Sequence, residues 1–192
     1  MKKNVFSLVL AIVFGFTATA STPIDGEKKE VKTSESTVVW KGYKVTGSHA
    51  GTIALKEGFL LFDGNKLTGG EFVIDMSTLV TTDKLGDMKG KLEGHLKSDD
   101  FFGVEAHPTA KLVFTNIKTF NKNSHTATGD LTIKGTTKPI TFVISIYGSK
   151  ATATLKIDRT KYDIKYGSGS FFDNLGDKAI YDEFDLVVDL AF

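Results

Sequence analysis

The stretch "GDLTIKGTTKPITFVISIYG", residues 129–148, decides the fold class because it holds two alternating segments joined by a turn. Apolar side chains occupy every second position in both segments: Leu131 and Ile133, then Phe142, Ile144 and Ile146. A period of two places such side chains on one face of a β-strand. Residues 134–139 between them, "KGTTKP", are typical of turns. The stretch therefore predicts a β-hairpin with one apolar face.

The same alternation recurs along the rest of the chain. Further alternating segments lie at residues 37–43, 52–64, 71–79, 110–117, 153–159 and 184–192. Phe72 and Phe114 fall on the apolar faces of two of them. Together with the hairpin they make about eight strands, which predicts an all-β antiparallel fold, either a closed barrel or a sandwich. Closure is favoured because it removes unpaired strand edges.

One segment breaks the period of two. Residues 83–100, "DKLGDMKGKLEGHLKSDD", carry an apolar stripe at spacings of three, four and four, which is one face of a helix. The stripe consists of Leu85, Met88, Leu92 and Leu96. Asp83 or a neighbouring threonine can cap the helix, and Gly86, Gly90 and Gly94 weaken it. We expect one short amphipathic helix packed on the sheet.

The N-terminal 20 residues are read as a signal peptide. Lys2 and Lys3 precede a short apolar run at residues 5–16, and small residues follow up to Ala20. A retained membrane anchor is the alternative, although the run is short for that purpose. Residues 21–36 are charged and poor in large apolar residues, which indicates a flexible linker. Residues 37–192 then form the folded domain.

The composition excludes several classes of protein. Without Lys2 and Lys3, 22 of the 24 basic residues remain against 23 acidic ones, a net charge of −1. This balance gives no electrostatic reason to expect nucleic acid as a partner. The chain has no cysteine, which removes disulfides, thiol nucleophiles and cysteine-based zinc sites.

Five motifs, in order and at matching spacing, resemble the YceI-like family, the polyisoprenoid-binding barrels of bacteria. They are "WKGYKVTGSHAGTI", "GGEFVIDMSTL", "HLKSDDFFGVEAHPTAKLVFT", "TATGDLTIKGTTKPITFVI" and "IDRTKYDIKYG". The resemblance runs from Val39 to Phe192. It implies an eight-stranded lipocalin-like β-barrel that holds a long-chain isoprenoid or another amphiphile in its lumen, commonly after export to the periplasm. It implies no catalytic residues.

Strand parity and the loops supply the candidate binding residues. The lumen candidates are Phe72, Phe114, Leu131, Ile133, Phe142, Ile144 and Ile146. The rim or wall candidates are two adjacent pairs, Phe101 with Phe102 and Phe171 with Phe172. For each pair, ordinary core packing is the alternative to contact with a ligand. Strand parity does not by itself decide which apolar face is the inner one.

Arg159 continues the inward parity of its strand. A buried arginine has to be paired with a carboxylate or reach water. Asp75 or another strand carboxylate is one expected partner. The anionic head group of a ligand, such as a phosphate or carboxylate, is the other.

Metal binding and catalysis have little support. His95 and His107 lack the spacing of a metal site, and His49, between glycines in "GSHAG", is better explained as a hydrogen-bonded imidazole. The catalytic patterns G-x-S-x-G and H-E-x-x-H do not occur. We therefore expect no metal, no cofactor and no enzyme activity.

The sequence thus predicts an exported protein, periplasmic or secreted after cleavage near Ala20, that sequesters or carries an isoprenoid or similar amphipathic lipid. A structural barrel with a filled interior and, less favoured, an envelope enzyme are the alternatives. Pairing into a homodimer stays open, because barrels with an exposed apolar patch often associate.

Overall fold

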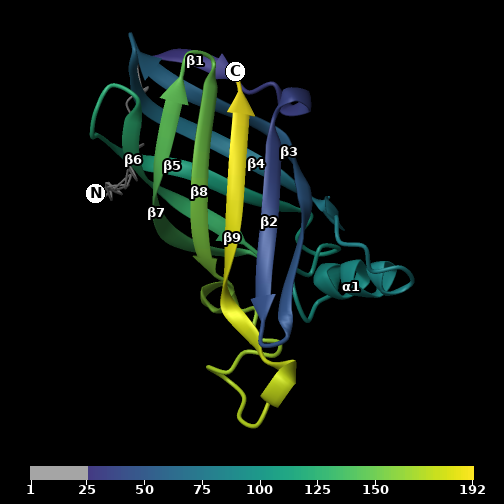
Figure 1. Ribbon diagram of the computed structural model, residues 1–192. Helices are drawn as coiled ribbons and strands as arrows, with labels where there is room; N and C mark the ends of the chain where they lie inside the picture. Colours follow the sequence, from purple (N-terminus) through teal and green to yellow (C-terminus); the bar gives the residue numbers. More distant parts are fainter. Residues whose placement is uncertain (1–25) are drawn as a thin grey trace, which may run out of the picture.

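The computed structural model describes residues 26–192 (Figure 1). The predicted signal peptide, residues 1–20, lies outside the described residues. Eight antiparallel strands form a closed barrel, because β9 pairs with β2 and β4 pairs back onto β3. The strands are β2 (Thr37–Lys44), β3 (Gly47–Asp63), β4 (Lys66–Thr81), β5 (Thr109–Thr119), β6 (Ser124–Ile133), β7 (Thr136–Tyr147), β8 (Lys150–Asp158) and β9 (Ile180–Ala191). The predicted eight-stranded antiparallel, lipocalin-like β-barrel is confirmed.

A short additional strand, β1 (Glu27–Glu30), pairs with Phe59–Phe62 of β3, and a 3-10 turn follows at Thr33–Glu35. These elements fall within residues 21–36, the segment assigned to a flexible linker, so that assignment fails from residue 27 onward. The sequence of this strand does not show the apolar alternation that predicts a strand, because its charged side chains cover aromatic rings of β3. Lys28 Nζ lies 4.2 Å from the centre of the Phe59 ring.

Side chains fill one half of the barrel, at the end where β3 turns into β4 and the C-terminus lies. The rings of Phe72 and Phe114 are 5.5 Å apart, and those of Phe114 and Phe142 are 5.7 Å apart. Ile144 is buried beside this aromatic row, and Phe62 stacks on Phe192 at 5.6 Å. Ring contacts of this kind are typical of a packed core, and none of these rings lines the cavity described below.

His125 of β6 is the titratable side chain of the filled half. It is buried, its Nδ1 lies 3.2 Å from Thr119 Oγ1, and burial lowers the pKa of its imidazole below the usual 6.5. The folded state therefore binds a proton less readily than the unfolded state does. Its contribution to stability is complete above about pH 6.5 and is lost as the pH falls through the lowered pKa.

We expect the His125→Leu variant to lack this part of the pH dependence. Urea unfolding of both proteins at several pH values between 5 and 8 measures it. As the pH falls, the unfolding free energy of the unaltered protein should decrease relative to that of the variant. A difference that stays constant over this range would show that His125 takes up its proton equally well in both states.

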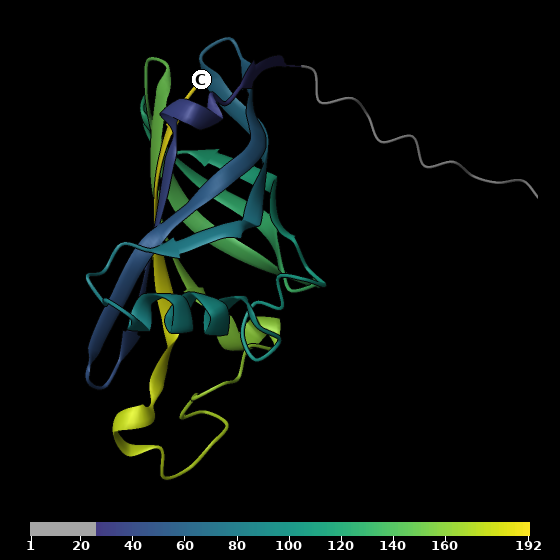
Figure 2. The ribbon, with the colours of Figure 1, turned by 90° about the vertical axis from the view of Figure 1, so that its right-hand side faces the viewer.

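The opposite end of the barrel is closed by helix α1 (Met88–Lys97) and by the loops around it (Figure 2). The helix lies across this end and is tied to β4, because Glu93 Oε1 accepts a hydrogen bond from Thr81 N and Lys97 Nζ donates one to Ser77 O, both at 2.8 Å. The helix was predicted, but the predicted cap at Asp83 or a neighbouring threonine is wrong. The helix begins after Asp87, whose side chain makes no capping hydrogen bond. Among the described residues, no helix has the length and apolar character needed to cross a membrane.

Candidate functional site

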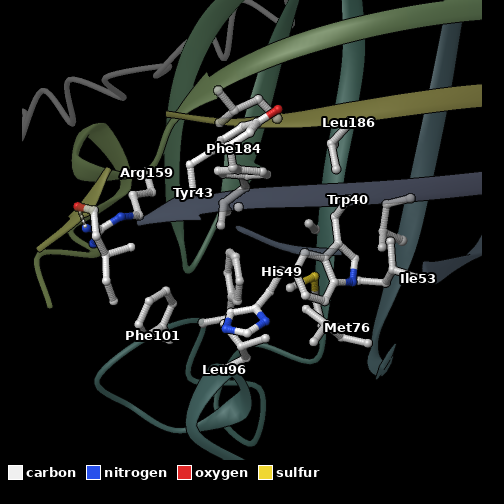
Figure 3. A pocket seen from close by; sticks show the side chains of 18 of the residues that line it. Trp40, Tyr43, His49, Ile53, Met76, Leu96, Phe101, Arg159, Phe184 and Leu186 are labelled. Atoms are coloured by element: carbon white, nitrogen blue, oxygen red, sulfur yellow. Dashed lines mark hydrogen bonds between the residues drawn. The ribbon is translucent and has the colours of Figure 1, made fainter. Parts of the chain in front are cut away.

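Between the filled half and helix α1 the barrel contains a partly open cavity of about 190 Å³ (Figure 3). Its walls are almost entirely apolar. The main side chains are Val38, Trp40, Ile53, Ile74, Met76, Leu79, Ala110, Leu131, Ile133, Ile157, Phe184 and Leu186 from the barrel strands, and Leu92, His95 and Leu96 from α1. Figure 3 shows Arg159 and Phe101 at one end of the cavity and Trp40 with Ile53 at the other.

Trp40 forms a wall of the cavity because its strand partner has no side chain. Gly51 lies directly opposite Trp40 in the β2–β3 ladder. A Cβ atom on Gly51 would overlap the Val80 carbonyl oxygen and lie 2.6 Å from Trp40 Cζ2. The indole Nε1 donates to that same Val80 oxygen at 3.1 Å, which satisfies its polar group away from the cavity. Only the apolar part of the ring therefore faces the cavity.

Aromatic rings close the cavity beneath helix α1. Phe101 packs against His95 at 5.2 Å and against Phe102 at 6.1 Å, and Phe102 in turn meets Phe184 at 6.3 Å between ring centres. Tyr166 lies on the outer side, 4.4 Å from the ring of His95. The segment that carries the phenylalanine pair is fixed by backbone bonds to the C-terminal end of α1. The motif predicted as either a corner of the core or a wall of the cavity is thus both.

Arg159 is almost fully buried, 3% exposed, at the edge of the cavity. Its guanidinium donates to three carbonyl oxygens, those of Ile164 at 2.8 Å, Ile180 at 3.0 Å and Tyr181 at 3.1 Å. Asp182 Oδ1 lies 3.6 Å from Nη2. Burial lowers the pKa of Arg159, an effect that the charge of Asp182 partly offsets. The charged partner is therefore another strand carboxylate, Asp182 of β9, and not Asp75, whose Oδ1 accepts a hydrogen bond from Ser77 N.

The bonds of Arg159 compensate for an interruption in the barrel wall. The β2–β9 ladder passes from the pair Gly42–Phe184 to the pair Lys44–Ile180, so that Tyr181 has no regular partner on β2. Arg159 binds the carbonyl oxygen of Tyr181 instead. Burial opposes ionisation of Asp182, yet hydrogen bonds from Ser168 and Ser170, together with the charge of Arg159, hold the pKa of its carboxyl below the usual value. The two charges remain a stable pair at this edge.

His49 is hydrogen-bonded, as its surroundings in the sequence suggested. Its Nδ1 lies 2.8 Å from Asp83 Oδ2, which ties the segment before α1 to β3. Asp83 thus links the segment before α1 to β3 and does not cap the helix, which begins at Met88. Within residues 26–192, no cluster of three or more histidine, aspartate or glutamate side chains is arranged to hold a metal ion.

The structure brings only part of the predicted site together. Five predicted residues border the cavity: Phe101, Phe102, Leu131, Ile133 and Arg159. Five predicted lumen residues do not, because they pack on one another or on the core of the filled half: Phe72, Phe114, Phe142, Ile144 and Ile146. Phe171 and Phe172 are also outside the lining; both are half exposed on a loop.

Sequence reasoning missed the residues of β2, β9 and α1 that make much of the wall. Trp40, Phe184 and Leu186 share the inward parity of their strands, and that signal was available. Leu92 and His95 could not be assigned, since nothing in a helical stripe shows that the helix lies across an open barrel end. Parity separates the inner from the outer face of a strand, but it does not separate the hollow half of a barrel from the filled half.

Gly90 and Gly94 lower the stability of helix α1, although the space around them would accept a larger side chain. A Cβ atom on either residue would meet nothing within 4 Å, and both residues are exposed. Alanine should stabilise a helix interior by about 1 kcal/mol per site relative to glycine. We expect Gly90→Ala with Gly94→Ala to raise the unfolding free energy of the helix by about 2 kcal/mol and to slow exchange of its amide hydrogens. Unchanged exchange rates in α1 would show that its opening does not depend on helix strength.

Comparison with known proteins agrees with this architecture. The YceI-like domain profile matches residues 29–192. A UPF0312 protein of Pseudomonas putida is 33% identical over 107 residues, which are 53% of this chain and 54% of that protein, so the chain spans about half the length of the curated relatives it matches.

Two solved structures share the fold. BcnA of Burkholderia cenocepacia has a TM-score of 0.63 at 22% identity, covering 84% of this chain and 99% of that one. A polyisoprenoid binding domain from Saccharophagus degradans has a TM-score of 0.56 at 13% identity, covering 84% and 97%. At these identities the likeness concerns the fold alone. Because the domain profile extends over nearly all of the described residues, the chain belongs to the YceI-like domain family.

Proposed function

We propose that the protein binds one long-chain isoprenoid or a similar amphipathic lipid in the barrel cavity. The observation that carries this proposal is the apolar, partly open cavity of about 190 Å³ between the filled half and helix α1. Each methylene moved from water into such a space gains roughly 0.8 kcal/mol. The fold shared with a polyisoprenoid binding domain from Saccharophagus degradans supports the same ligand class.

The size of the cavity limits how the lipid sits. At about 30 Å³ for a group the size of water, it has room for at least about six such groups. That space accommodates one isoprene unit and the start of the next. The part of a longer chain that exceeds this space would lie outside the barrel or displace α1 and the segment of Phe101 and Phe102.

Arg159 contributes by holding the edge of the cavity. Its donors bind three backbone carbonyl oxygens, and Asp182 balances its charge. An anionic head group would have to displace Asp182 to use this charge. The arrangement favours a lipid whose head group carries no net charge near Arg159.

Export completes the proposal. The predicted signal peptide, with cleavage near Ala20, would place the barrel in the periplasm or outside the cell, where an oily ligand needs a carrier through water. Binding accounts for the cavity without any catalytic step.

Solvent extraction of the protein purified without detergent, followed by mass spectrometry, tests the proposal. We expect one lipid with a long apolar chain at close to one molecule per protein. A protein that carries no lipid, and takes up none when mixed with isoprenoid quinones, polyprenols or fatty acids, would instead be a structural barrel.

A further inference from the structure

Exposed apolar side chains gather at the cavity end of the barrel. The segment from Lys165 to Tyr181, here called the aromatic segment, projects beyond the strands in both views (Figures 1 and 2). Phe171 and Phe172 lie on it and are 49% and 51% exposed. Its other exposed rings are Tyr166 and Tyr181, and the same end of the barrel exposes Val45 and Met88.

The two phenylalanines are held outward by hydrogen bonds in the aromatic segment. The backbone N–H groups of Phe171 and Phe172 both donate to the carbonyl oxygen of Ser168, at 3.2 and 3.0 Å. Ser168 itself is fully buried. Ser170 Oγ donates to Asp182 Oδ2 at 2.5 Å, which joins the turn to the Arg159–Asp182 pair. A fixed turn on a buried anchor thus presents two adjacent aromatic rings to the surroundings.

The aromatic segment adjoins the cavity through the interrupted part of the barrel wall. Tyr43, Ile180 and Tyr181 line the cavity and also line an open groove of about 480 Å³ on the outer side. Gly169 and Ser170 of the aromatic segment border this groove. The wall between the two spaces is therefore a single layer of side chains, at the place where the β2–β9 ladder is irregular.

We propose that the aromatic segment docks on a zwitterionic lipid bilayer, with Phe171 and Phe172 inserted among the acyl chains. This inference rests on the proposed function. It makes the membrane the source of the lipid, since docking brings the thin wall of the cavity to the bilayer. The charges of the segment fit an electrically neutral surface: Lys165 and Lys178 balance Asp173 and Asp177. Large exposed apolar groups on a rigid projection are the feature that such a surface stabilises.

Sedimentation with phosphatidylcholine vesicles tests the proposal on protein purified from an exporting host. Burying the exposed half of a phenylalanine is worth on the order of tenfold in affinity. We expect the F171S/F172S double variant to bind vesicles at least tenfold more weakly. Added salt should change the binding of the unaltered protein little, because the aromatic segment has no net charge.

Phe120 provides the matched control. It is 84% exposed but lies in the turn between β5 and β6, at the opposite end of the barrel, so F120S should bind vesicles as the unaltered protein does. Equal binding by all three proteins, or no binding by the unaltered one, would overturn the proposal. So would a dimer that F171S/F172S disrupts in the absence of vesicle binding, since the aromatic segment would then join two copies of the chain.

Lipid uptake from ethanol solution separates this inference from the proposed function. We expect F171S/F172S to load a soluble short-chain isoprenoid as well as the unaltered protein does, because the cavity is intact. If the unaltered protein loads the isoprenoid but does not bind vesicles, the docking surface alone is refuted. Vesicle binding without loading refutes the binding cavity and leaves the docking surface standing.

Discussion

The Arg159→Met variant is expected to lose about 3–5 kcal/mol of unfolding free energy, because one partner of a buried ion pair is removed. Methionine keeps the apolar stem but leaves three carbonyl oxygens without their donor. It also leaves the Asp182 carboxylate without its opposite charge. The irregular β2–β9 edge would then be held mainly by the remaining ladder bonds.

Urea unfolding measures this loss, and Lys156→Met is the matched control. Lys156 also pairs with an aspartate, Asp185 at 3.0 Å, but its side chain is 56% exposed, so we expect a loss below about 1 kcal/mol. Adding Asp182→Asn to Arg159→Met should recover part of the stability, since no unpaired charge remains. A cost for Arg159→Met no larger than that of Lys156→Met would show that the guanidinium does not hold the edge.

Lipid occupancy should fall to less than about a tenth in the Ala110→Trp variant, because an indole would fill much of a cavity of about 190 Å³. Ala110 is a buried cavity residue of β5, opposite Ile74 of β4. An indole at this position occupies the space in which the proposal places the lipid. Mass spectrometry of solvent extracts from equal amounts of folded protein gives the occupancy.

The control for this variant lies in the filled half. Ile144→Val shortens a side chain that is 2% exposed and outside the cavity lining, so it should cost about 0.5–1.5 kcal/mol of stability and leave occupancy unchanged. A lipid content in Ala110→Trp equal to that of the unaltered protein would place the ligand elsewhere. Overpacking can also destabilise the barrel, so the melting temperature of each variant is needed beside its occupancy.

Local patterns in the sequence predicted the antiparallel strands but left a barrel or a sandwich, and the resemblance to the YceI-like family pointed to the barrel. The alternation around Leu131 and Ile144 depends only on neighbouring positions, and strand closure follows from the general cost of an open edge. Strand parity also suggested that Arg159 points inward, and its side chain is buried, although the residue lies just after β8 in a 3-10 turn at Arg159–Tyr162. The strand Glu27–Glu30 was missed because its pairing is with a distant part of β3 and its lysines cover rings there.

The cavity was harder to predict because its limits depend on how side chains from several strands meet. Phe72, Phe114 and Phe142 have the inward parity of lining residues, yet their rings pack into one row and leave no space. Leu131 has the same parity and does border the cavity. Which of these inward positions is filled depends on the tilt and stagger of all eight strands, and no single segment contains that information.

Because the lumen is divided into a filled half and a cavity, substitutions in the two parts have separate effects. Substitutions among the rings near Phe114 change how well the barrel holds together and are removed when they weaken it. Substitutions around Ala110 or Leu92 alter the shape offered to a guest while the other half keeps the strands in register. Descendants of such a barrel can therefore acquire new cargoes by accumulating changes at one end, without first gaining surplus stability.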